Sequence, residues 1–256
     1  NKTMSITFGK PRFVDDEEQE IEKYTYLTLY GSGFVRPKEK SHDMGDSFKI
    51  TAIARNKINE NKYPNENCII EYTPSDFDFF KIINSQKSIK RLDIYCHGWT
   101  EGLNLGGFLG KREIEGTEID GDSLDWKSQE GNIRAIFINK IKKIDASVFT
   151  SDTKIFFWGC NIGGRLDNKG NHIADDRNKD PKSTFAQSFA EHIGKGEVYA
   201  LVGKGNSAGS MLKMDEKGKP YYEDGELLPA NISFNYKNKN TKKLKAIDYM
   251  KKFPLE

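Results

Sequence analysis

The chain has 256 residues, of which 36% are hydrophobic and 12% aromatic, enough to bury the core of one large domain. Its 40 lysines and arginines nearly balance 38 aspartates and glutamates, so the net charge of +2 predicts neither a nucleic-acid partner nor a membrane partner. No apolar stretch reaches the length of a membrane-spanning helix. Three irregularly spaced cysteines do not make a disulfide framework.

Residues 1–44 are predicted to be an N-terminal β appendage or pro-segment, packed on a main domain of residues 45–256. Within them, Tyr24–Tyr30 alternates aromatic and β-branched residues and stops at glycines, which predicts a strand in an edge hairpin with Ser5–Phe8. The chain begins with Asn1 rather than Met, so two locations stay open: secretion after removal of a leader, or the cytoplasm.

From residue 45 onward, apolar runs of strand length alternate with segments of helical spacing. We predict strands at Phe48–Ala54, Cys68–Tyr72, Leu92–Cys96, Ile155–Trp158, Val198–Val202 and Ile232–Tyr236. We predict helices at Ser75–Ile83, Asn132–Ile144, Ser183–Ile193 and Leu244–Lys252, and a hairpin-like region at Asp215–Gly225. This alternation is typical of an α/β domain with a mostly parallel central sheet and helices on both faces.

Two of the predicted strands end at residues that can carry chemistry. The run Leu92–Cys96 ends in His97 followed by glycine, and the run Ile155–Trp158 ends in glycine followed by Cys160. Ligands of open α/β sheets bind at the carboxyl ends of the strands. If the two strands are parallel neighbours, His97 and Cys160 therefore face one crevice, which is the pairing that a thiol nucleophile and its base require.

This order of motifs resembles the caspase-like cysteine peptidases, the group that also holds legumains, gingipains, clostripain and separases. These proteins share an apolar strand that ends in His-Gly, a spacer, and a second apolar strand that ends in a small residue and Cys. The matching segments are Leu92–Gly98 and Ile155–Cys160. The resemblance implies a caspase-like α/β fold, a peptide or protein substrate, and no cofactor.

The resemblance also implies roles for individual residues. Cys160 would attack the scissile carbonyl and form an acyl-enzyme, and His97 would act on the leaving amine as general acid. The backbone N–H groups of Gly98 and Cys160 would bind the oxyanion. Taken singly, His97 as a core histidine and Cys160 as a buried thiol are the simpler interpretations, but their pairing at two strand exits favours catalysis. Cys68 and Cys96 lie inside apolar runs and are expected to be buried thiols.

For the substrate, the resemblance implies that the loop after the fifth predicted strand walls the primary specificity pocket, where Asn206 and Ser207 would line it. Asp175 and Asp176 lie in the long polar loop of residues 165–182 and would favour a basic substrate side chain, although solvated surface acids are the simpler interpretation. The length and position of this loop also suggest an autoprocessing site.

Three alternatives stay open. A serine α/β-hydrolase using Ser207 is disfavoured, because the hydrolase order is Ser, acid, His, and all 4 histidines precede Ser207. A metal site would draw on Cys96, His97, Cys160 and His172. Their spacing fits no paired-ligand motif, and we predict no metal. A catalytically latent, caspase-like binding module would keep the fold, but the presence of both catalytic residue types argues against it.

Overall fold

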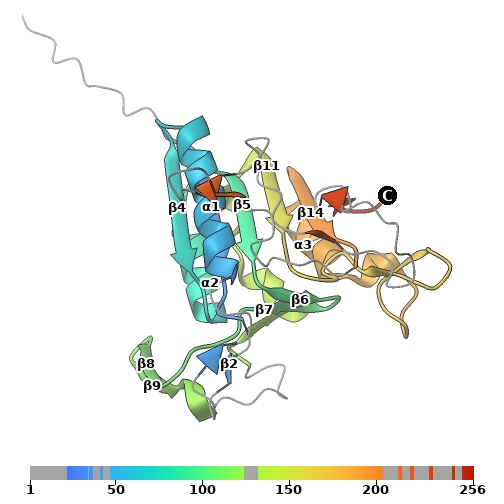
Figure 1. Ribbon diagram of the computed structural model, residues 1–256, viewed down its shortest axis with the longest axis horizontal. Helices are drawn as coiled ribbons and strands as arrows, with labels where there is room; N and C mark the ends of the chain where they lie inside the picture. Colours follow the sequence, from blue (N-terminus) through green and yellow to red (C-terminus); the bar gives the residue numbers. More distant parts are fainter. Residues whose placement is uncertain are drawn as a thin grey trace, which may run out of the picture.

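The centre of the molecule is a 6-stranded sheet with the strand order β4–β1–β5–β11–β14–β19 (Figure 1). The computed structural model describes residues 22–33, 35–36, 41–42, 47–123, 132–203, 213–214, 220–221, 231–232, 244–245 and 250–256. The six strands are β4 Asn67–Tyr72, β1 Thr25–Tyr30, β5 Ile89–Tyr95, β11 Phe149–Phe157, β14 Glu197–Leu201 and β19 Met250–Phe253. All neighbours pair in parallel except β14 and β19, which are antiparallel. The chain is therefore an α/β protein with a mostly parallel central sheet.

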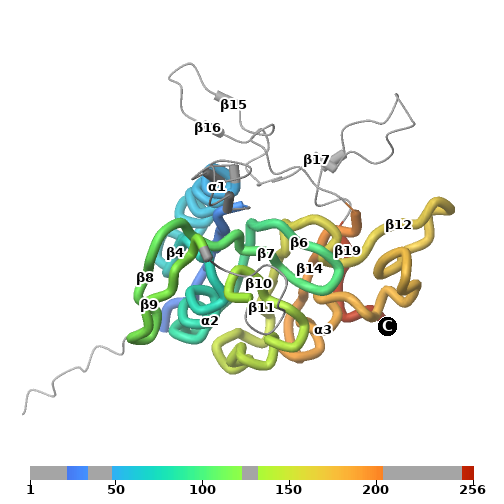
Figure 2. Tube along the Cα trace, turned by 90° about the horizontal axis from the view of Figure 1, so that it is seen from below, coloured from blue at the N-terminus to red at the C-terminus, as the bar shows by residue number. Residues whose placement is uncertain are grey.

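Helices cover the sheet on both faces (Figure 2). The helices are α1 Ser47–Lys62, α2 Asp76–Asn84 and α3 Phe185–Ile193. Because side chains alternate along a strand, Leu92 and Ile94 of β5 join the apolar core under α2 and α3, whereas Tyr95 joins a second cluster under α1. None of these helices, and no other helix among the described residues, is long and apolar enough to cross a membrane.

The order of the strands puts a topological switch point at the carboxyl edge of the sheet. From β1 the chain passes through α1 to β4 on one side, and β5 then returns to the other side of β1. This is the doubly wound order 2-1-3-4-5, in which ligands bind where the connections of two neighbouring strands diverge. Here those two strands are β1 and β5, so the exit of β5 lies at the switch point.

Shorter elements surround that edge. A 3-stranded sheet consists of β6 His97–Trp99, β7 Gly102–Asn104 and β10 Ala135–Phe137. The two-stranded pairs are β8 Lys111–Ile114 with β9 Thr117–Asp120, β12 Arg165–Leu166 with β13 His172–Ile173, β2 Val35–Arg36 with β3 Ser41–His42, β15 Lys213–Met214 with β16 Pro220–Tyr221, and β17 Asn231–Ile232 with β18 Leu244–Lys245. The 3-10 helices are η2 Gly121–Ser123, η3 Ile138–Lys143, η4 Ala146–Val148 and η5 Pro181–Ser183.

The elements with clear boundary signals agree with the sequence prediction. The strands predicted from Cys68, Leu92, Ile155 and Val198 correspond to β4, β5, β11 and β14, and the helices predicted from Ser75 and Ser183 correspond to α2 and α3. The Ser75 side chain accepts a hydrogen bond from the Asp78 amide and caps α2. Gly194, with φ of 66°, ends α3 in the left-handed conformation.

The predicted strand Phe48–Ala54 is wrong, because these residues form the first turns of α1. The segment alternates apolar and polar residues, which is typical of a strand. In the structure the buried positions follow helical spacing instead and include Phe48, Ala52 and the polar residues Arg55 and Asn59. A helix that buries arginine and asparagine carries a weak apolar stripe, so the period of two dominated the sequence pattern.

Two predicted helices are also wrong. The segment Asn132–Ile144 contains β10, which pairs with β7, followed by η3. Its buried Lys140 bonds to the Asp76 carboxylate and to backbone carbonyls, a tertiary constraint that local periodicity does not report. The segment Leu244–Lys252 contains β18 and the start of β19, the antiparallel edge strand. Edge pairing of that kind depends on a partner far away in the sequence.

The strand in Tyr24–Tyr30 exists, but it is not peripheral. As β1 it pairs on both sides, with β4 and β5, and Leu27 and Leu29 are fully buried. The β1 part of the predicted appendage thus belongs to the main sheet, whereas β2 and β3 pair with each other. The expected partner Ser5–Phe8 lies outside the described residues, as do most of the predicted strand Ile232–Tyr236 and of the hairpin-like region Asp215–Gly225.

Phe157→Ala tests the core beneath α3. The Phe157 ring lies edge-on against Phe185 and Phe189, with centroids 5.6 and 4.8 Å away. We expect the substitution to lower the free energy of unfolding in urea by about 3–5 kcal/mol, since it leaves a cavity. Ile50→Ala on the exposed side of α1 is the control, with an expected change within about 0.5 kcal/mol. Equal losses in the two variants would contradict this core.

Candidate active site

His97 and Cys160 each follow one of two neighbouring parallel strands, β5 and β11. In the parallel pairing of β5 and β11, Ile94 is opposite Phe157. The next amide, that of Trp158, donates to the Ile94 carbonyl at 2.9 Å. Continuing this register along both strands puts Cys160 opposite His97. Opposite positions of a parallel pair share a face of the sheet, so this continuation assigns Cys160 to the face that carries α1, where His97 contacts Phe48.

The two strand exits are in backbone contact at their glycines. A Cβ placed on Gly159 would lie 2.8 Å from the Cys96 carbonyl oxygen and 3.1 Å from the Gly98 nitrogen. A Cβ on Gly98 would lie 3.0 Å from the Cys160 carbonyl oxygen. Both positions are also blocked by the Ile162 side chain, whose Cδ1 would be 2.6 Å from either Cβ. Glycine at both positions is therefore required for the exits to meet.

Cys160 sits at the tip of a tight turn. Asn161 has φ of 58°, the left-handed region that asparagine tolerates better than most residues. The turn is fastened to the end of β14, because the Asn161 amide donates to the Gly203 carbonyl at 2.8 Å and the Gly163 amide to the Leu201 carbonyl at 2.9 Å. The Cys160 side chain stays half-buried and is not in a disulfide.

His97 is held from two sides. It opens β6 and pairs with Asn104 of β7 in the antiparallel hairpin. On the other side the ring of Phe48, in the first turn of α1, meets the imidazole edge-on with 5.1 Å between ring centroids. The imidazole is half-buried. An aromatic wall and a hairpin strand thus restrict its orientation beside Cys160.

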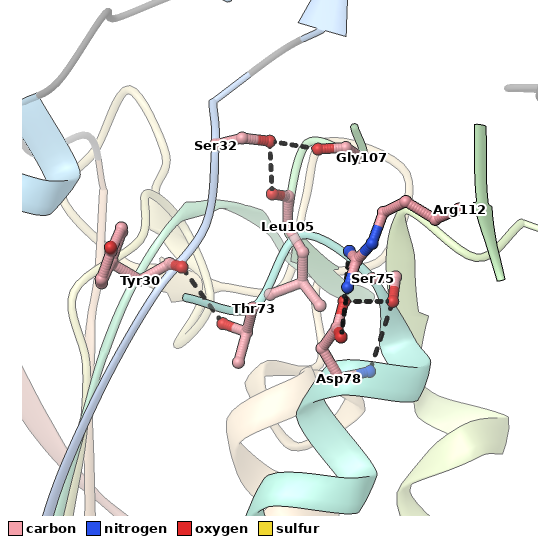
Figure 3. Close-up of polar contacts among 8 residues, drawn as sticks. All are labelled: Tyr30, Ser32, Thr73, Ser75, Asp78, Leu105, Gly107 and Arg112. Atoms are coloured by element: carbon pink, nitrogen blue, oxygen red, sulfur yellow. Dashed lines mark hydrogen bonds and ion pairs between the residues drawn. The ribbon is translucent and has the colours of Figure 1, made fainter. Parts of the chain in front are cut away.

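The exit of β1 is bonded to the segment that follows β7 (Figure 3). The Gly31 amide donates to the Tyr95 carbonyl at 2.9 Å, two residues before His97. The Ser32 hydroxyl contacts the Gly107 carbonyl at 2.6 Å and the Leu105 carbonyl at 3.2 Å. These bonds connect the end of β1 to the segment that follows β7, which contains Gly106, Gly107 and Gly110.

Glycines on both sides of this contact, Gly31 after β1 and Gly106 after β7, allow close backbone packing. A Cβ on Gly31 would lie 2.6 Å from the Leu105 carbonyl oxygen, and one on Gly106 only 1.5 Å from the Gly33 carbonyl oxygen. Gly106 also has φ of 94°. The contact between two chain segments accounts for these glycines without a ligand.

Polar contacts fasten the neighbouring loop as well (Figure 3). Arg112 makes a two-pronged ion pair with Asp78, with N–O distances of 3.1 and 3.2 Å. The Ser75 hydroxyl bonds to the same carboxylate at 2.6 Å. The Thr73 hydroxyl contacts the Tyr30 carbonyl at 3.2 Å. The N-terminus of α2 and the exit of β1 are thereby fixed.

A buried ionic cluster lies beneath the site, and the sequence analysis missed it. Asp93 is fully buried; Arg91 reaches its carboxylate at 2.6 and 3.0 Å, and the Trp158 indole donates to it at 3.0 Å. Burial acts to raise the pKa of Asp93, but the two nearby guanidinium groups and these hydrogen bonds outweigh it, and the pKa lies below its ordinary value. The signal was available: Arg91 and Asp93 interrupt an otherwise apolar strand.

The two acidic candidates for substrate binding serve their own loop. Asp175 accepts the amides of Arg177 and Asn178 at 2.7 and 2.8 Å, and these backbone bonds lower its pKa. Asp176 pairs with Arg165 at 2.7 Å. Their predicted contact with a basic substrate side chain stays a prediction. Asn206 and Ser207 lie outside the described residues.

The four residues of the metal alternative are not gathered. Cys96 faces the core on the opposite side of the sheet from His97, and burial raises the pKa of its thiol. His172 contacts the Gly163 carbonyl at 2.6 Å and the Lys251 amine at 3.3 Å. Within the described ranges, no group of three or more His, Cys, Asp and Glu side chains is placed to hold a metal ion.

Comparison with known proteins adds no relative. A scan against models of protein families finds no match for this chain, and a search of curated proteins finds no significant similarity.

The contact of both exits with Ile162 predicts energetic coupling between them. Gly98→Ala should lower the free energy of unfolding by about 1–3 kcal/mol through overpacking, and Ile162→Ala by about 2–5 kcal/mol through a cavity. The double variant should be less destabilised than the sum by about 0.5–3 kcal/mol, because the cavity accepts the new methyl group. Urea unfolding measures all three.

The control pairs Gly98→Ala with Ile83→Ala, a fully buried residue of α2. These two changes should add within about 0.5 kcal/mol, as independent sites do. Additivity in the Gly98 and Ile162 pair would show that the exits do not meet on Ile162.

Proposed function

We propose that this chain is a cysteine endopeptidase of the caspase-like superfamily that cleaves peptide bonds with a dyad of His97 and Cys160. One observation carries the proposal: β5 and β11 are parallel neighbours paired up to Ile94 and Phe157, and His97 and Cys160 each follow three residues later, at the carboxyl edge of the sheet. The order of the two motifs in the sequence supports the same assignment.

In this proposal Cys160 is the nucleophile. Its sulfur attacks the scissile carbonyl carbon as the thiol proton passes to His97. The carbon–nitrogen bond then breaks, and the imidazolium of His97 returns that proton to the leaving amine. Water, deprotonated by His97, attacks the thioester, and the acid product and the free thiol are released. Atoms and protons balance without a cofactor.

The oxyanion would be bound by the amides of Gly98 and Cys160. The Gly98 nitrogen lies beside Gly159, where a Cβ would be 3.1 Å away, so it belongs to the same contact as the Cys160 exit. Two amides at such a junction can donate to a developing negative charge, and donors of this kind contribute about 100- to 1,000-fold in rate. Peptide and protein chains are the substrate class that this acyl-transfer chemistry serves.

The test is hydrolysis of an unfolded protein and a peptide library, with covalent labelling by peptide-based thiol electrophiles and mass spectrometry. Cys160→Ala should abolish turnover and labelling, and His97→Ala should lower kcat about 100-fold or more. Cys68→Ser is the matched control, because Cys68 is also a half-buried free thiol but lies in β4. It should keep full activity.

Turnover that survives Cys160→Ala and stops in Ser207→Ala would replace the proposal with the serine hydrolase. A folded wild-type protein that neither turns over any substrate nor takes up label at Cys160 would be a latent binding module.

A further inference from the structure

Tyr95 and Trp158 each lie two residues before a member of the proposed dyad, and their rings belong to the apolar cluster under α1. If the alternation of side chains continues past the ends of β5 and β11, Tyr95 shares a face with His97, and Trp158 shares that face with Cys160. The two rings stack with 5.9 Å between centroids and 7° between planes. Both side chains are buried, with exposed fractions of 0% and 3%. A buried aromatic layer thus joins the two chain segments that lead to His97 and Cys160.

One hydrogen bond crosses from β5 to β11 in this layer. The Trp158 indole N–H donates to the Asp93 Oδ1 at 3.0 Å. Asp93 is opposite Phe156 in the register, so the bond runs diagonally between the strands. A tryptophan whose face is stacked and whose N–H is bonded has one orientation. The residue that fixes this orientation is the buried carboxylate.

Two arginines hold the carboxylate in turn. Arg91 binds it with two nitrogens, and the Arg55 Nε of α1 lies 3.8 Å from its Oδ1. The positive charge of Arg55 also acts on the phenol of Tyr95. Arg55 belongs to α1, the same helix whose Phe48 contacts the His97 ring. The Asp93 carboxylate is thus contacted from α1 by Arg55, from β5 by Arg91, and by Trp158 at the end of β11.

Energy alone does not account for this cluster. A buried ion pair pays a desolvation cost of several kcal/mol per ion, and well-packed apolar residues of similar volume are often as stable or more so. The surrounding face offers such packing, since Phe156 and Tyr199 stack in the same layer. What a directional bond adds is a fixed orientation of Trp158 relative to β5.

We propose that Asp93 and Trp158 are positioning residues of the dyad: their hydrogen bond sets the height and orientation at which Cys160 leaves β11 relative to His97. The inference rests on the proposed function. Neither residue touches the substrate, so both act through Cys160.

The experiment compares Trp158→Phe and Asp93→Asn with the wild type in peptide hydrolysis. Both variants should lower kcat about 10- to 100-fold at nearly unchanged KM, because small misplacements of reacting groups have effects of this size. The double variant should be no slower than the slower single variant, since the two residues act through one bond. A purely structural role would instead lower the fraction of folded enzyme and leave kcat per active site unchanged.

Tyr199→Phe is the matched control. It removes a hydroxyl that donates to Glu197 at 2.9 Å, on a ring that stacks in the same layer but belongs to β14. Its kcat should equal that of the wild type. If Tyr199→Phe and Trp158→Phe reduce kcat equally, the layer acts as general packing and the positioning role is overturned.

A second measurement covers variants that fail to fold. In wild-type protein labelled at its tryptophans, the indole N–H resonance of Trp158 should exchange slowly with solvent and shift when Cys160 is modified by a peptide electrophile. An unshifted resonance overturns the proposal.

The failure of this inference and the failure of the proposed function give different results. If the proposed function fails, turnover survives Cys160→Ala. If only this inference fails, turnover depends on Cys160, and folded Trp158→Phe and Asp93→Asn keep a normal kcat.

Discussion

The parallel pairing of β5 and β11 is the constraint on which the candidate site depends. Side chains of a strand alternate between faces, so a shift of this pairing by one residue would turn one dyad member toward the core and leave the other outside. The observed register pairs Ile94 with Phe157, and its continuation by three residues along each strand brings Cys160 opposite His97, while Cys96 lies in the core. The proposed dyad therefore depends on the backbone pairing of β5 with β11, which precedes both reacting residues in the chain.

Several costly features of the chain converge on that pairing. Gly98 and Gly159 lack side chains, which allows the two strand ends to pack together against Ile162. Asn161 takes a left-handed conformation at the turn that presents the thiol. The charge of Asp93 is buried between the two strands. Each feature is unfavourable for a simple structural strand end, and together they hold one arrangement at the edge where open α/β sheets bind ligands.

The sequence predicted the parts of the fold that carry local signals. The strands before His97 and Cys160 are apolar runs closed by glycine, and α2 and α3 have capping residues at their ends. It failed where a partner far away in the chain decides the structure. Phe48–Ala54 is helical because α1 packs on the aromatic face, and Met250–Phe253 is a strand because β14 offers a free edge. No local pattern contains either partner.

For the site, the sequence identified the two strand exits but not what supports them. His97 and Cys160 could be paired from motif order and the rule for strand ends. The bond between Asp93 and Trp158 could not, because it requires the register of β5 and β11, which apolar runs leave undefined. Asp175 and Asp176 are conspicuous in the sequence, and the sequence did not predict their contacts in the structure, which are a local turn and one ion pair.

The most direct test of the central claim is the rate at which Cys160 reacts with iodoacetamide across pH 5–9, in wild type and in His97→Gln. If the two residues form one chemical unit, loss of the imidazole removes the group that stabilises the thiolate or accepts its proton. The rate near neutral pH should then fall about tenfold or more, with a changed pH profile, while the rate at Cys68 stays the same. Superimposable profiles for Cys160 in the two proteins would contradict the account.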